Sequence, residues 1–163
     1  MDVDSKGREE SGMEDSVKNV KARLRGLFDL QRFAVLATLD GASPYASLMT
    51  FAVTDDLKHV ILVTSRETRK YDNLRKNSRV ALLIDSRSNK ESDVKEAVAV
   101  TVIGDAREAE EDERERLLGL YRKKHPLLDE FARSPSQALI NVTVQSYVVV
   151  NGLQDVSEFS PAP

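Results

Sequence analysis

Two adjacent cations in an unusual position are the first residues of this chain that could do chemistry. The segment TSRETRKYDN, residues 64–73, places Arg69 and Lys70 near the expected start of a helix, directly after an apolar run that ends in Thr64 and Ser65. Cations usually lie near the C-terminal end of a helix, where the helix dipole is negative. A bound anion would explain cations at a helix start, because the backbone N–H groups and both side chains would face one negative charge. We interpret the segment as a candidate phosphate site, against the alternative of a solvated helix face.

Two extended apolar segments lead into this turn. Residues 44–53 read PYASLMTFAV and residues 59–65 read HVILVTS, with Asp55 and Asp56 between them. Both are rich in strand-forming residues, and successive side chains of a strand point to opposite faces. On the first strand neither face is polar, since Tyr45, Ser47, Met49, Phe51 and Val53 share one and Ala46, Leu48, Thr50 and Ala52 share the other. We therefore expect a core on one side and a partner or ligand on the other.

The remaining pattern predicts a small antiparallel barrel with few helices. Asp40-Gly41 and Asn151-Gly152 are typical hairpin turns. Further strands are predicted at residues 33–39, 80–84, 97–103, 138–150 and in a short segment through Phe159. Helices are predicted from about Asp15 to Gln31, over residues 68–77, in the acidic-to-basic segment that Pro126 ends, and over residues 127–132, with a polar loop over residues 85–94. The fold class is therefore all-β or α+β, with six or seven strands.

The polar N-terminus differs from the rest of the chain. Residues 1–13 show no apolar period, so we predict a disordered tail, followed by a single domain over residues 14–160. This start is neither a signal nor a transit peptide, and no apolar run approaches the roughly 20 residues that span a bilayer. A cytoplasmic, non-membrane protein is the expectation.

Composition and motifs exclude several kinds of chemistry. The chain has no cysteine, two histidines and a net charge of −3, which argues against thiolate or His-rich metal sites and against nucleic acid as a partner. There is no GxGxxG, P-loop, GxSxG or HExxH motif. His125 precedes a proline at a helix end, where a protonated imidazole would suit the dipole, and His59 is expected at the surface. No residue stands out as a catalytic acid or base.

The ordered set of segments resembles the pyridoxamine 5'-phosphate oxidase-like flavin-binding split barrels, and in particular their shorter relatives, which include haem-utilisation proteins. The segments that carry the resemblance are PYASLMTFAV, VTSRETRKYDNL, RVALLID, AVTVIGDAREA, YRKKHPLLDEF and YVVVNGLQDVSEF, so that it covers roughly residues 22–159. It implies a split β-barrel with flanking helices.

The resemblance also implies a cofactor and its site. The family's adjacent Arg-Lys pair falls on Arg69 and Lys70, which would bind the phosphate of FMN, with the hydroxyls of Thr64 and Ser65 nearby. The strand residues Ser47, Leu48, Met49 and Thr50 would run along the isoalloxazine ring and the ribityl chain. The family forms homodimers with the flavin at the subunit interface, so the expected partners are a second copy and NAD(P)H or a small acceptor.

The departures from the family concern the vitamin substrate. Ser47 and Ala52 stand where the oxidases have Arg and Lys, Ala99 stands where they have a flavin-contacting Gln, and this chain has no Trp. The sequence therefore predicts an FMN-binding oxidoreductase that is not a pyridoxine phosphate oxidase. The alternatives are a haem-binding protein, a non-catalytic flavin-binding dimer, or a deazaflavin-binding protein on the same barrel.

Overall fold

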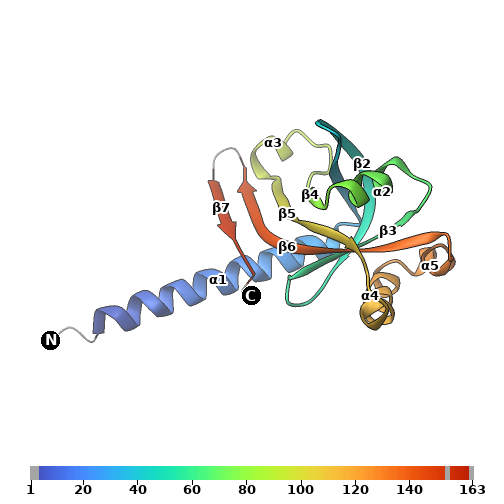
Figure 1. The fold of residues 1–163 in the computed structure, drawn as a ribbon. Coiled ribbons are helices and arrows are strands. Elements are labelled where there is room, and N and C mark those ends of the chain that lie inside the picture. Colours follow the sequence, from blue (N-terminus) through green and yellow to red (C-terminus); the bar gives the residue numbers. More distant parts are fainter. Residues whose placement is uncertain (1–3, 153–154, 162–163) are drawn as a thin grey trace.

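Alternating apolar residues build seven antiparallel strands, and six of them close into a barrel (Figure 1). The structure is a computed structural model that describes residues 4–152 and 155–161, with side chains from Val17 onward. The strands run in the order β3-β2-β1-β4-β5-β6-β7, and β3 also pairs with β6, which closes the barrel. Their bounds are β1 Phe33–Asp40, β2 Ser43–Val53, β3 His59–Ser65, β4 Arg79–Asp85, β5 Val98–Glu108, β6 Gln137–Asn151 and β7 Asp155–Phe159. The predicted fold class and strand number are confirmed.

The helices flank the barrel and lie outside it. They are α1 Asp4–Leu30, α2 Arg69–Lys76, α3 Asp93–Glu96, α4 Glu111–Lys124, a 3₁₀ turn η1 Pro126–Leu128 and α5 Asp129–Arg133. Helix α3 begins at the end of the segment predicted as a polar loop, residues 85–94, and continues beyond it. None of the helices in the described residues is long and apolar enough to cross a membrane.

Helix α1 begins much earlier than its apolar pattern indicates. Residues 4–13, which the sequence predicts as a disordered tail, belong to this helix, while residues 1–3 lie outside the described part. The segment contains Lys, Arg, Glu and Met, which are good helix formers, and the amphipathic half that follows provides a nucleus from which it can propagate. Figure 1 shows this first part of α1 extending away from the barrel.

The barrel interior is the main hydrophobic core. Leu36, Phe51, Leu62 and Leu82 are completely buried there, and α1 closes one end with Leu24, Leu27 and Phe28. A second, smaller cluster lies outside the barrel wall, where Ile61 and Ala52 contact Leu117 and Tyr121 of α4. Strand β2 therefore has a covered outer face only near its C-terminal end.

Strand β5 is longer than predicted because its glycine does not end it. A β-bulge at Ile103/Gly104 shifts the register against β6, and pairing then continues to Glu108. A Cβ at Gly104 would lie 2.4 Å from the carbonyl oxygen of Thr143, so only glycine allows the two backbones to come this close. The bend carries β5 to the start of α4.

The final hairpin forms where it was predicted. Gly152 has a φ of 56°, the left-handed conformation that this kind of turn requires. Residues 153–154 lie outside the described residues, and β7 pairs back onto β6 from Asp155 to Phe159. β7 is thus an additional strand next to the closed barrel.

Candidate functional site

The candidate site begins where strands β2 and β3 separate. They pair only through Phe51–Val53 of β2, although β2 starts at Ser43 and β3 continues to Ser65. Within the described residues, the β3-facing edge of β2 therefore has no ladder partner between Ser43 and Thr50. Continuing the register beyond Phe51 and Leu62 would place Met49 opposite Thr64, on the two sides of the split. The predicted ring-contacting residues thus face the predicted phosphate turn across an unpaired strand edge.

Helix α2 brings the two predicted cations to the beginning of β2. The guanidinium of Arg69 lies 5.4 Å from the centre of the Tyr45 ring, and its Nε is 3.7 Å from the Asp40 carboxylate. The Arg69 side chain is 64% exposed, so neither contact holds it firmly. Lys70 follows at the next helical position and is half-buried. An exposed arginine beside a half-buried lysine leaves both available to a ligand.

The first turn of α2 has backbone donors that its N-cap does not satisfy. The N-cap residue Thr68 makes no side-chain capping bond to the helix. Its hydroxyl donates instead to the Ser65 carbonyl at 2.8 Å and lies 3.2 Å from the Thr64 hydroxyl. The first N–H groups of a helix need such a partner. Their availability beside Arg69 favours an anion at this position.

The two predicted hydroxyls shape the turn. Thr64 is 4% exposed, and its hydroxyl contacts Thr68. The Ser65 hydroxyl accepts the backbone N–H of Glu67 at 3.2 Å. The structure therefore places Thr64 and Ser65 next to the cations, but it uses their side chains to fix the strand-to-helix turn.

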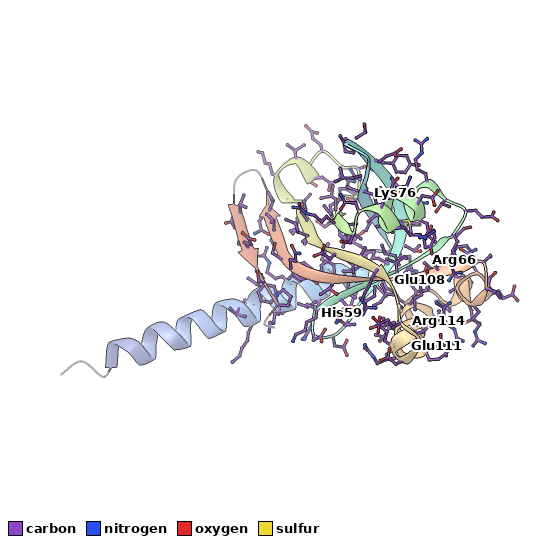
Figure 2. The ribbon with its side chains drawn as sticks, in the orientation of Figure 1. His59, Arg66, Lys76, Glu108, Glu111 and Arg114 are labelled. Atoms are coloured by element: carbon purple, nitrogen blue, oxygen red, sulfur yellow. The ribbon has the colours of Figure 1, made fainter. Side chains whose placement is uncertain are left out.

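An ion-pair cluster anchors the opposite side of α2. The Glu108 carboxylate accepts hydrogen bonds from Arg66 and from the Tyr71 hydroxyl, the latter at 2.8 Å, and Arg66 also donates to the Pro135 and Gln137 carbonyls. Burial raises the pKa of Glu108, but the bonds from Tyr71 and Arg66 outweigh it and lower that pKa. Figure 2 shows Arg66 and Glu108 together at this junction. The cluster fixes α2 against β5 without engaging Arg69 or Lys70.

Three consecutive β2 side chains beside the split differ in their surroundings. The Ser47 hydroxyl is buried and has no hydrogen-bond partner among the described residues, an arrangement that costs free energy unless a ligand or water satisfies it. Leu48 is 65% exposed on the outer face of the barrel, and Met49 is buried in the main core. Met49 can therefore offer only its backbone to a ligand.

Thr50 lies at the end of the exposed part of β2, beside an open cleft of about 730 Å³. Its hydroxyl lies 2.6 Å from that of Tyr121, which is fully buried. The cleft has apolar walls and a basic rim without any acidic side chain, and it is lined by Arg32, Phe33, Thr50, Lys123, Lys124, His125, Pro126, Leu127 and Leu128.

Both histidines have a ring nitrogen bound within the protein. His125 is 5% exposed, and its Nε2 lies 2.8 Å from the Phe51 carbonyl. Burial lowers the pKa of His125, opposed by the bond to that carbonyl, so the neutral imidazole is favoured over the protonated form expected from the sequence. His59 is half-buried, with Nδ1 3.0 Å from the Asn141 side-chain oxygen. Within the described residues, no cluster of His, Asp and Glu could hold a metal ion.

The sequence interpretation missed three residues of this site. Asp40 and Tyr45 contact Arg69, and the Tyr121 hydroxyl is hydrogen-bonded to that of Thr50. The two members of the last pair are 71 positions apart in the chain, so no local pattern connects them. Asp40 was recognised only as a turn residue, and the alternation of apolar residues in β2 made Tyr45 look like a core residue.

Comparison with protein families and solved structures gives a consistent result. The pyridoxamine 5'-phosphate oxidase family model matches residues 20–151. A putative pyridoxamine 5'-phosphate oxidase from Listeria innocua superposes with a TM-score of 0.64 and 20% identity, covering 81% of this chain and 98% of that one. Among curated protein sequences, none matches this chain.

Two further solved structures share the fold. A heme binding protein from Mycobacterium smegmatis has a TM-score of 0.73 and 20% identity over 80% of this chain. This chain covers only 53% of that protein, about half of its length. An FAD-binding protein from Mesorhizobium loti has a TM-score of 0.62 and 15% identity, with 78% of this chain and 90% of that one covered. At these identities the likeness concerns the fold.

Proposed function

The chain belongs to the pyridoxamine 5'-phosphate oxidase family, and on that premise we propose that it binds FMN in the split between β2 and β3 and acts as a flavin-dependent oxidoreductase. The observation that carries the proposal is the start of α2, where uncapped backbone N–H groups adjoin Arg69 and Lys70. A dianionic phosphate satisfies both features, because it accepts the N–H bonds and offsets two positive charges.

The rest of the split suits the ring system and the ribityl chain. The unpaired edge of β2 offers backbone N–H and C=O groups from Ser47 to Thr50. Ribityl hydroxyls and the polar edge of an isoalloxazine ring are suitable partners for these backbone groups. Bound FMN would supply electron transfer, and the residues of the chain would bind and orient it and exclude water.

The substrate differs from pyridoxine phosphate. The strand residues that replace the cations of the oxidases are Ser47, which carries no charge, and Ala52, which is 3% exposed beneath α4. Neither can hold a second phosphate. We propose that the reductant is NADH or NADPH and that the acceptor is a small molecule or free flavin.

The active form in this proposal is a homodimer. Outward-facing residues of four adjacent strands form continuous apolar rows, Leu48–Val35–Leu83 and Ala46–Ala37–Ala81–Ile103. Leu48, Leu83 and Ile103 remain 65%, 38% and 39% exposed in the single chain. A second copy covering this face would bury the rows and would lie next to the split, which accounts for a β2 strand that is apolar on both faces.

The dimer is tested with a substitution on the face but outside the split. Leu83→Glu on β4 should convert a dimer into a monomer in sedimentation analysis and should also weaken FMN binding, because the partner closes the site. An exposed control in the loop between β4 and α3, Lys90→Glu, should change neither the oligomeric state nor FMN binding. A wild-type protein that is monomeric at micromolar concentration would contradict the dimer but not the phosphate site.

The cofactor is tested directly with the purified chain. Titration with FMN and with riboflavin should show much tighter binding of FMN, and anaerobic NADH or NADPH should bleach the bound flavin. Failure to take up FMN would refute the cofactor assignment. Uptake without reduction by either nucleotide would support the non-catalytic alternative.

Haem is the second candidate, favoured by the cleft beside Thr50. Its apolar walls and the basic rim of Arg32, Lys123 and Lys124 suit a flat ligand with carboxylates. The buried, hydrogen-bonded His125 would have to turn outward to coordinate iron. A Soret band after addition of haemin that is lost in His125→Ala would support this reading. A deazaflavin ligand would be recognised by its own absorption spectrum.

A further inference from the structure

We propose that Tyr121 is a positioning residue that directs the hydroxyl of Thr50 into the cleft as a hydrogen-bond donor to the bound ligand. The inference rests on the proposed function, since it assigns a role at the far end of the same flavin site. It goes beyond that function because it names a residue of α4 that does not line the cleft and a specific polar contact to the ring.

The geometry couples two consecutive β2 residues to one face of α4. Tyr121 and His125 are four positions apart and therefore lie on the same side of the helix. The Tyr121 hydroxyl is 2.6 Å from that of Thr50, and His125 Nε2 is 2.8 Å from the carbonyl oxygen of Phe51. Since burial favours neutral His125, Nε2 must carry the proton in order to donate to that carbonyl. Thr50 is thus fixed through its own side chain and through its neighbour's backbone.

The direction of the bond between the hydroxyls follows from burial. Tyr121 is completely buried, and Thr50 is its only hydrogen-bond partner among the described residues. If Thr50 donated the bond, the phenolic O–H would be left in the core without an acceptor, which native structures avoid. A phenol is also the more acidic of the two groups. Tyr121 therefore donates, and the O–H of Thr50 is free to point elsewhere.

Thr50 is half-buried and lines the cleft. On its other side the outer face of β2 is covered by α4, beginning with Ala52. A ligand that binds with its phosphate at the start of α2 and its ring along residues 47–50 ends beside Thr50. The matching group is a hydrogen-bond acceptor on the polar edge of the ring, and the donated bond is strengthened because Tyr121 polarises Thr50.

The test is a double-mutant cycle on bound FMN with Thr50→Val, Tyr121→Phe and the combined variant. Each single variant should weaken FMN binding by about fivefold, the value of one hydrogen bond, and should shift the visible bands and lower the midpoint potential, because reduced flavin gains most from a donor. The combined variant should match Thr50→Val alone, since the two groups act as one unit. Thr50→Ser should retain the wild-type values.

Tyr147→Phe is a matched control, because Tyr147 is also fully buried and its hydroxyl makes one 2.6 Å bond, to the Leu57 carbonyl. This variant should lose stability but keep the wild-type spectrum and potential. If FMN binds to the wild type and Tyr121→Phe leaves spectrum and potential unchanged, or if the single effects simply add, the inference is overturned while the proposed function stands. If the wild type takes up no FMN, both are overturned.

Discussion

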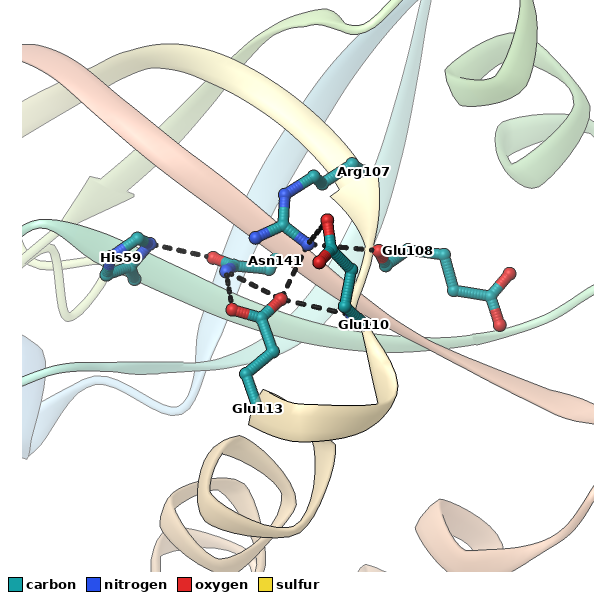
Figure 3. A network of polar contacts seen from close by, with 6 residues as sticks. All are labelled: His59, Arg107, Glu108, Glu110, Glu113 and Asn141. Atoms are coloured by element: carbon teal, nitrogen blue, oxygen red, sulfur yellow. Dashed lines mark hydrogen bonds and ion pairs between the residues drawn. The ribbon is translucent and has the colours of Figure 1, made fainter.

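Helices α2 and α4 both start directly after a strand or a short turn, yet their first turns are built in opposite ways. In α4, the Glu113 carboxylate accepts the backbone N–H of Glu110 at 3.2 Å, and it also binds Arg107 and the buried Asn141 (Figure 3). In α2, the Thr68 N–H bonds to the Ser65 carbonyl, but no side chain caps the helix, and its first two residues are cations. The start of α4 is held by side chains of this chain, whereas the start of α2 has two cations and no side-chain cap among the described residues.

The contrast separates the α4 start, which has a structural network, from the α2 start, at which we propose an anion. Asn141 is completely buried and links Glu113 to His59, so that three elements meet at α4 (Figure 3). The bond from Arg107, opposed by burial, lowers the pKa of Glu113. Within the described part of the chain, Arg69 in comparison has an exposed ion pair and a ring contact. Loss of the α4 contacts should affect stability, and loss of the α2 cations should affect binding.

The largest expected effect is on binding at α2. Arg69→Ala combined with Lys70→Ala removes two charge-assisted contacts, each worth roughly 1.5–3 kcal/mol, so FMN affinity should fall by at least about a hundredfold. Riboflavin affinity should hardly change, since it has no phosphate. Fluorescence titration measures both constants. An equal loss of affinity for FMN and riboflavin would contradict a phosphate site at α2. The exposed pair Arg75→Ala with Lys76→Ala, at the other end of the helix, serves as the control.

The next effect is on stability at α4. Glu113→Ala should reduce the free energy of unfolding by about 2 kcal/mol, because it removes a cap and leaves the Asn141 amide unsatisfied. The loss should appear in urea denaturation, while Glu115→Ala, exposed on the same helix, should stay within about 0.5 kcal/mol of the wild type.

The same carboxylate should make stability depend on pH. Because the folded pKa of Glu113 is lowered from 4.5, its contribution to stability is complete above pH 4.5 and disappears as the pH falls through the folded pKa. A stable Glu113→Ala variant would mean that the network in Figure 3 has little energetic value.

A smaller effect should appear when α2 is given an internal cap. Thr68→Asp places a carboxylate at the N-cap, which should stabilise the chain by about 0.5–1 kcal/mol. The same carboxylate would occupy the position proposed for the phosphate and repel it, so FMN affinity should decrease. Thr68→Ser should change little. If both the stability and the FMN affinity rise in Thr68→Asp, an anion site at this helix start is contradicted.

The smallest expected effect is on the pH dependence of stability and concerns Lys124 in the last turn of α4. Lys124 donates to the Phe28 carbonyl at 2.7 Å and lies over the Phe51 ring, and burial lowers its pKa from 10.5 to about 8. Between these values the unfolded chain binds a proton that the folded chain does not, so the free energy of unfolding should rise with pH. The rise should be under about 1 kcal/mol, because solvent screens this half-buried group. In Lys124→Met the difference in stability between pH 8 and pH 10 should be smaller than in the wild type.

The fold was largely predictable because its signals are local. Alternation in residues 44–53 and 59–65, and the turns at Asp40-Gly41 and Asn151-Gly152, indicate strands and hairpins without reference to the rest of the chain. The predicted end of strand β5 was wrong because a tertiary contact overrides the local pattern there. Gly104 lies within the strand, where the backbone of Thr143 approaches it closely.

By itself, the sequence determined the strand order along the chain, the two cations at the start of α2 and the family resemblance that the family model confirms. The tertiary structure alone decided what these cations can reach. The split opens between the consecutive strands β2 and β3, on the N-terminal side of Phe51. Arg69 contacts Asp40 and Tyr45, and Tyr121 contacts Thr50 across 71 positions of the chain. Barrel closure brings such segments together. The free energy of closure comes from a hydrophobic core that is distributed over the whole chain. The residues that become neighbours therefore carry no local sequence pattern that announces their contact.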